Sequence, residues 1–136
     1  MSRILLALAL VSLFPLSSFG SDVIVRGVGN YKSTGAGSEY TLSIKSAGEG
    51  YTMDLDGESS THCKGKLTIS FSDSNSVETN FEPTECKSRI PGEEKSMEMG
   101  RITLNPNSGK ASVRLFQNEA EEHYGNAAIN VELSRS

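Results

Sequence analysis

Cys63 and Cys86 are the only cysteines of the chain, and their chemistry is the best defined in the sequence. Two cysteines allow a single intramolecular disulfide, which persists where the compartment is oxidising. A zinc–thiolate site would need closely spaced pairs such as CxxC, and a catalytic thiol would leave the second cysteine without a role. We therefore predict a disulfide between Cys63 and Cys86.

Neither histidine of the chain, His62 or His123, stands in a recognisable catalytic pattern. A nucleophilic site needs a serine, threonine or cysteine beside a base that a third group orients, and the chain has no Gly-X-Ser-X-Gly elbow. Glu119 and His123 are four residues apart and can share a helix face, which supplies only two local metal ligands. The sequence predicts no catalytic residue.

Asp54, Asp56 and Gly57 match part of a calcium-binding loop, in which spaced carboxylates come before a glycine at a sharp turn. In that alignment Thr52 takes the first ligand position and Cys63 the position of the closing glutamate, and neither residue type fits. Asp-Gly at the end of an alternating strand is also an ordinary hairpin turn. We predict neither a metal site nor a cofactor.

The elements that must position these residues are strands, because the apolar residues recur with a period of two. Glycine, asparagine, aspartate and serine separate the runs and favour turns. The alternating runs cover residues 23–30, 40–45, 51–56, 66–71, 77–81, 102–104, 111–115 and 126–133. This pattern predicts an all-β fold, a small antiparallel meander of about eight strands that forms either an up-and-down barrel or a two-sheet sandwich.

The two cysteines flank a predicted hairpin. Residues 64–71 and 77–81 are expected to pair across a turn at 73–76, and the cysteines lie about equally far from that turn on its two sides. Such placement sets Cys63 nearly opposite Cys86, so the disulfide would hold the open end of the hairpin.

Phe71 is predicted to lie in the core of this hairpin. Leu67, Ile69 and Phe71 share one side of a period-two strand, whereas Thr68 and Ser70 share the other. We therefore expect the first three side chains to be buried and the other two to face outward.

Two segments lack the alternating pattern. Residues 83–97 are polar and contain Pro83 and Pro91, which predicts a long loop. Residues 117–123 are expected to form one or two helical turns within a loop over 117–125. Loops on a rigid scaffold are common recognition sites, so both segments are candidates for binding.

Residues 1–20 have the order of a cleavable signal peptide. Arg3 precedes an apolar stretch over residues 4–16, and Ser18 and Gly20 are small residues suited to the peptidase. The apolar stretch is shorter than the roughly 20 residues that span a membrane. Export to the periplasm or the exterior is therefore expected, with cleavage after Gly20.

The remaining residues, 21–136, fit a single β-rich domain. The chain carries 13 Lys and Arg against 17 Asp and Glu, a net charge of −4, and losing Arg3 makes it −5. An acidic chain without clustered basic residues argues against nucleic acid as a partner and against electrostatic docking on anionic membranes.

Together these features predict an exported soluble β-domain, a non-enzymatic binding or inhibitor-like module whose partner is a protein or a small-molecule ligand. The alternative is a small hydrolase of envelope polymers that uses acidic residues or His123. An outer-membrane barrel would need strands of about 9–11 residues and aromatic girdles. Most runs here are shorter and aromatic residues make up 7% of the chain, so we expect no stable membrane insertion.

Overall fold

The computed structural model describes residues 23–33, 39–57 and 60–136. The predicted signal peptide, residues 1–20, lies outside them. The elements are β1 (Gly29–Ser33), β2 (Thr41–Ala47), β3 (Gly50–Gly57), β4 (Thr61–Ser72), β5 (Val77–Arg89), β6 (Glu94–Ser96), β7 (Met99–Asn105), β8 (Lys110–Phe116), the helix α2 (Glu119–Tyr124) and β9 (Ile129–Arg135).

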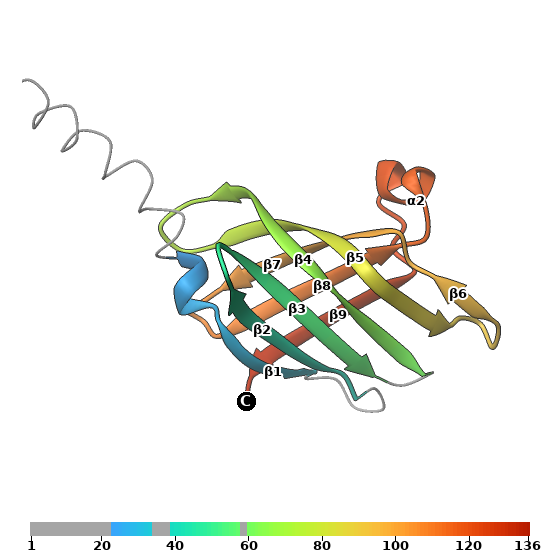
Figure 1. Cartoon of the computed structure of the whole chain (residues 1–136), viewed down its shortest axis with the longest axis horizontal. Coiled ribbons are helices and arrows are strands. Elements are labelled where there is room, and N and C mark those ends of the chain that lie inside the picture. The colour runs from blue at the N-terminus through green and yellow to red at the C-terminus, as the bar shows by residue number, and fades with distance from the viewer. Residues whose placement is uncertain (1–22, 34–38, 58–59) are drawn as a thin grey trace, which may run out of the picture.

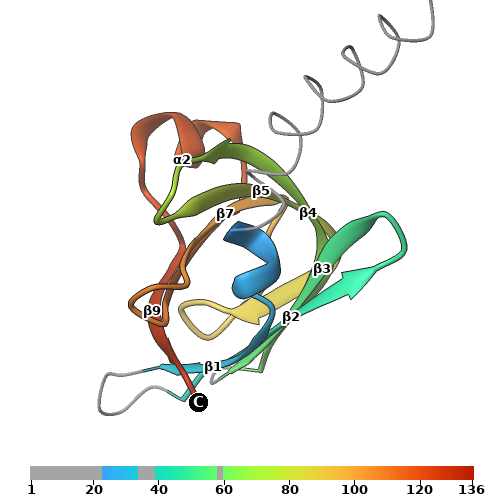
Figure 2. The ribbon, with the colours of Figure 1, turned by 90° about the vertical axis from the view of Figure 1, so that its left-hand side faces the viewer.

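The strands form a closed antiparallel barrel (Figures 1 and 2). Eight of them follow the order β4-β3-β2-β1-β9-β8-β7-β5, and the additional pairing of β4 with β5 closes the ring. The short strand β6 pairs with the far end of β5. The barrel alternative is confirmed over the sandwich, and the predicted meander order is also confirmed.

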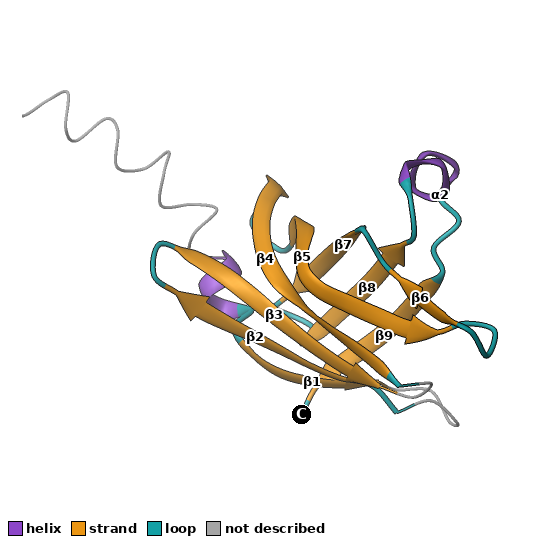
Figure 3. Ribbon diagram, turned by 45° about the vertical axis from the view of Figure 1, so that its right-hand side comes forward, coloured by secondary structure: helices purple, strands orange, loops and turns teal. Residues whose placement is uncertain are grey.

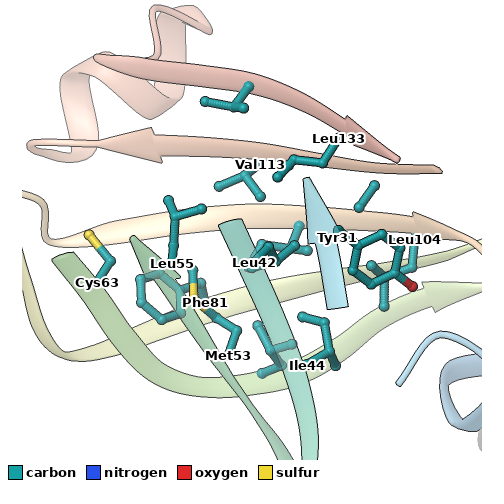
Figure 4. Packing of buried hydrophobic residues seen from close by; sticks show 14 of the residues in the cluster. Tyr31, Leu42, Ile44, Met53, Leu55, Cys63, Phe81, Leu104, Val113 and Leu133 are labelled. Carbon is teal, nitrogen blue, oxygen red and sulfur yellow. The ribbon is translucent and has the colours of Figure 1, made fainter. Parts of the chain in front are cut away.

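The inward-facing side chains fill the barrel. Tyr31, Leu42, Met53, Phe81 and Leu133 are each at most 2% exposed and come from five different strands (Figure 4). An eight-stranded barrel has an interior just wide enough for side chains to fill it. The described inward-facing side chains therefore form one hydrophobic cluster inside the barrel.

The predicted strand over 23–30 is wrong at its beginning, because residues 23–26 form a helical turn (Figure 2). The neighbouring residues Val23 and Ile24 are both buried, which a strand with alternating faces would not allow. Arg26 donates a hydrogen bond of 2.8 Å to Asn107 Oδ1, in the connection between β7 and β8. The turn thus covers one end of the barrel.

The predicted loop over 83–97 is also wrong. β5 continues through Pro83 to Arg89, and β6 follows it at residues 94–96. Pro83 is tolerated because the pairing of β4 with β5 is irregular there: Lys64 lies opposite Glu85 but Gly65 lies opposite Pro83, so Thr84 is an extra residue. The Thr84 hydroxyl donates a hydrogen bond to the Lys64 carbonyl oxygen.

Phe71 is exposed, so its predicted burial is wrong. A second bulge lies in β4, where Ile69 is opposite Thr79 and Phe71 is opposite Glu78, with Ser70 as the extra residue. The bulge reverses the inward–outward alternation, and Phe71 faces outward with 59% of its surface accessible. Leu67 is buried as predicted, and Thr68 and Ser70 are exposed as predicted. The predicted burial of Ile69 is wrong, since 38% of its surface is accessible where, among the described residues, β4 has no neighbour on its β3 side.

The helical turns predicted over 117–123 are confirmed as α2. The Asn118 side chain caps the helix by accepting a hydrogen bond from the Glu121 backbone amide, and Gly125 ends it in the left-handed conformation (φ 72°). In the described residues, no helix has the length and apolar character needed to cross a membrane.

Candidate functional site

The disulfide between Cys63 and Cys86 is present, and it joins two residues that lie directly opposite each other on β4 and β5. Both cysteines are buried, and their Cα atoms are 3.9 Å apart. A buried hydrogen bond of 2.6 Å between the hydroxyls of Thr61 and Ser88 lies just beyond them. Because water cannot reach the sulfurs freely, the bond acts as a structural crosslink.

A cluster of three titratable side chains lies on the outer face of β3 and β4. Asp56 and His62 are direct cross-strand partners, and Asp54 projects from the same side of β3 two residues earlier. His62 Nδ1 lies 2.6 Å from Asp56 Oδ1 and 4.0 Å from Asp54 Oδ1. One candidate ligand atom from each residue lies within 4.8 Å of the others, so the three could hold a metal ion together.

The electrostatics of this cluster favour a positive group at its centre. The hydrogen bond to Asp56 raises the pKa of His62 most strongly. Desolvation opposes this shift, and the charges of Asp56, Asp54 and Glu85 each raise the pKa further. Asp54 Oδ1 is inaccessible to solvent and has no hydrogen-bond partner in the described part of the chain.

The lysines opposite this cluster are paired elsewhere. Lys64 Nζ lies 3.9 Å from Glu85, and Lys87 Nζ lies 3.8 Å from Glu94. On the other side of the cluster, a surface hollow of about 390 Å³ is lined by Asp54 and Asp56 together with hydroxyl and lysine side chains of β2. A small ligand or solvent can therefore approach the carboxylates from the β2 side.

The sequence did not reveal this cluster. Asp54 and Asp56 fit a hairpin turn, and a search for metal ligands that are close in the sequence finds no partner for His62. The cluster forms only when the two strands pair. The signal that could have found it is the alternation itself. Pairing residues 51–56 with the strand that begins near Cys63 places His62 across from the outward-facing acids.

His123, the candidate base of the alternative hydrolase, lies on α2 with its ring 4.9 Å from that of Tyr124, edge to face. Within α2, Glu121 accepts a hydrogen bond from the Gln117 amide and stabilises the first turn of the helix. Among the described residues, the contact recorded for the His123 ring is therefore with Tyr124 and not with a carboxylate.

A second candidate surface is the free edge of β4. The pairing of β3 with β4 ends at Tyr51 and Leu67, so among the described residues the segment 68–72 pairs on one side only, with β5. This end of the β4–β5 hairpin stands apart from the β2–β3 hairpin (Figure 3). Ile69 and Phe71 are 38% and 59% exposed there. A hollow of about 500 Å³ between residues 47–52 and 66–69 borders the edge.

The protein is therefore a small up-and-down barrel with one disulfide and a packed hydrophobic interior, and it carries two candidate functional surfaces. No known protein family matches the sequence, and no curated protein and no solved structure is significantly similar to the chain.

Proposed function

We propose that the protein is an exported, non-enzymatic binding module that recognises an extended segment of a partner protein. The segment would pair with residues 68–72 of β4 and extend the sheet by one strand. The observation that carries this proposal is the edge of β4, which runs five residues beyond its last partner on β3 and bears two of the exposed large apolar side chains.

Exposed edges are usually protected by lysine, proline, a β-bulge or a covering element, because their unpaired backbone groups invite another strand. The β4 edge carries the bulge at Ser70. Residues 68–72 read Thr-Ile-Ser-Phe-Ser and contain neither a charge nor a proline. Backbone hydrogen bonds along such an edge supply affinity, and the exposed side chains supply specificity. Ile69 and Phe71 would therefore select apolar residues in the partner.

A second copy of the chain is a less suitable occupant. Five residues span only about 17 Å of edge, since a strand rises about 3.4 Å per residue. A stable dimer buries about 1,200–2,000 Å² in total, more than two such short edges alone provide. A short extended peptide matches the length of the edge better.

Export is supported by the buried disulfide, because such bonds are formed and retained in oxidising compartments. The filled barrel interior and the isolated His123 favour binding over hydrolysis. With the predicted signal peptide, these features support a role in the periplasm or outside the cell.

Photo-crosslinking in the producing cells tests this proposal. A photoreactive residue replaces Thr68 at the β4 edge or, as a matched control, the exposed Glu132 on β9. We expect a discrete protein adduct from position 68 and none from position 132. Adding Phe71→Asp should abolish the adduct while the disulfide and the circular dichroism spectrum stay unchanged.

Equal adducts at both positions, or an adduct that survives Phe71→Asp, would refute binding at the β4 edge. An adduct with the mass of a dimer of this chain would identify a second copy as the occupant and would also contradict the proposal.

A further inference from the structure

The three side chains Asp54, Asp56 and His62 lie on the outer barrel face, and the proposed binding at the β4 edge makes no use of them. We propose that they form a site for a divalent first-row transition ion such as Zn²⁺. The ligands are the imidazole Nδ1 of His62 and one oxygen of each carboxylate.

The geometry of the cluster is close to what such an ion requires. Ligand atoms about 2.0–2.2 Å from a tetrahedral zinc ion lie roughly 3.3–3.6 Å from one another. The separation between His62 Nδ1 and Asp56 Oδ1 is 2.6 Å, and that between His62 Nδ1 and Asp54 Oδ1 is 4.0 Å. The incoming ion replaces the proton shared by His62 Nδ1 and Asp56, and that proton is released to solvent. The first distance then opens and the second closes, each by less than about 1 Å, through side-chain rotation.

The backbone already places all three ligands. Asp56 and His62 are paired on adjacent strands, and Asp54 lies on the same face as Asp56 because side chains alternate along β3. Two strands of a crosslinked barrel thus supply the ligands, so little ordering of the chain is needed when the ion binds.

Charge at the site also favours a cation. Lys64 pairs with Glu85 and Lys87 pairs with Glu94. Lys32 and Lys45 line the same hollow as the two carboxylates, but in the described part of the chain no lysine forms an ion pair with Asp54 or Asp56. Asp54 is 45% exposed as a side chain, yet its Oδ1 atom is shielded from water and makes no hydrogen bond. A shielded carboxylate oxygen without a hydrogen bond is costly, and coordination to an ion would provide the missing partner.

The ligand set indicates which class of ion fits. Calcium and magnesium take oxygen ligands, whereas an imidazole nitrogen beside carboxylates suits zinc and its first-row neighbours. Three protein ligands leave a fourth position for water, as in open zinc sites. The hollow lined by Thr41 and Ser43 provides access to that position.

Zinc titration of the exported, disulfide-bonded protein, produced without a histidine tag and treated with chelator, tests the proposal. Calorimetry should detect one Zn²⁺ per chain. His62→Ala should abolish binding, Asp54→Asn and Asp56→Asn should each weaken it about tenfold or more, and the matched control His123→Ala should leave it unchanged. In parallel, the imidazole NMR signals of His62 should shift on zinc addition while those of His123 stay in place.

Absence of zinc binding at millimolar concentration would refute the site. Binding that survives His62→Ala, or that His123→Ala removes, would locate the ion elsewhere and overturn the assignment. Calcium binding of equal strength that is insensitive to His62→Ala would also overturn it. Because Phe71→Asp should leave the zinc titration unchanged, failure of this proposal is distinguishable from failure of the β4-edge proposal.

Discussion

Phe71 and Phe81 belong to the same hairpin but lie in opposite environments. Phe71 is 59% exposed, whereas Phe81 is 2% exposed and lies against two close glycines, Gly65 and Gly100. We expect Phe81→Ala to lower the free energy of unfolding by about 3–5 kcal/mol, because it leaves a cavity in the barrel. Phe71→Ala should change it by about 0.5 kcal/mol or less. Urea unfolding of both variants measures the difference, and similar losses would mean that the bulge at Ser70 is wrongly placed.

The Cys63–Cys86 disulfide closes a loop of about 24 residues, for which the chain-entropy estimate is about 3.5 kcal/mol. Replacing both cysteines with alanine should therefore lower the free energy of unfolding by about 2–4 kcal/mol. The oxidised wild-type protein should be two mass units lighter than its reduced form. Two free thiols in the native protein, or an unchanged unfolding midpoint for the double variant, would contradict this role.

Single residues were predicted well where their chemistry is local. The disulfide followed from the cysteine count, and α2 followed from a short run of helix-compatible residues after Asn118. The cluster around His62 depends instead on cross-strand register, which local spacing does not reveal. For the same reason Phe71 was assigned to the wrong face, since one inserted residue reverses every following side chain.

At the scale of elements, two bulges set the register of the β4–β5 hairpin. The extra residue at Ser70 in β4 is offset by the extra residue at Thr84 in β5. Because the two shifts cancel, Cys63 and Cys86 lie directly opposite each other, even though the pairs between the two bulges are shifted by one residue. The sequence count from the turn therefore predicted the crosslink correctly, although it did not predict either bulge.

Gly65 is required by the bulge at Thr84. A Cβ atom at position 65 would lie only 2.1 Å from the Glu82 carbonyl oxygen and 2.7 Å from the Phe81 ring, whereas one at Gly50 would meet nothing within 4 Å. We expect Gly65→Ala to destabilise the barrel by about 1–3 kcal/mol through overpacking. Gly50→Ala, the control, should stay within about 0.5 kcal/mol. Thermal unfolding compares the two, and equal stability would contradict the bulge.

Asp73 stabilises the turn of the same hairpin through its charge. Its carboxylate accepts hydrogen bonds of 2.8 Å from the amides of Asn75 and Ser76, and these bonds lower the pKa of Asp73. The stabilisation is therefore present above the ordinary aspartate pKa and is lost as the pH falls through the lowered value. The difference in urea midpoint between wild type and Asp73→Asn should be constant near neutrality and shrink below about pH 4. A difference independent of pH would contradict this account.

At the scale of the whole molecule, alternation predicted the all-β meander because each strand has one buried face. Alternation could not choose between barrel and sandwich, since both bury the same faces. The β4–β5 hairpin fits either fold, and the pairing of β1 with β9, the first and last strands, closes the barrel. The helical turn at 23–26 was missed because residues 23–30 were treated as one alternating run, although Val23, Ile24 and Val25 are consecutive apolar residues. Its role becomes clear only with the barrel present, whose end Val23 and Ile24 cover.

The central claim is that a partner strand joins the free edge of β4, and hydrogen exchange of the crosslink-identified complex tests it most directly. Amides within 68–72 that point away from β5 should exchange markedly more slowly in the complex than in the free protein. Amides of residues 61–67, which already lie between β3 and β5, should be unchanged. Unaltered exchange over 68–72, with protection appearing instead at α2 or β9, would contradict the claim.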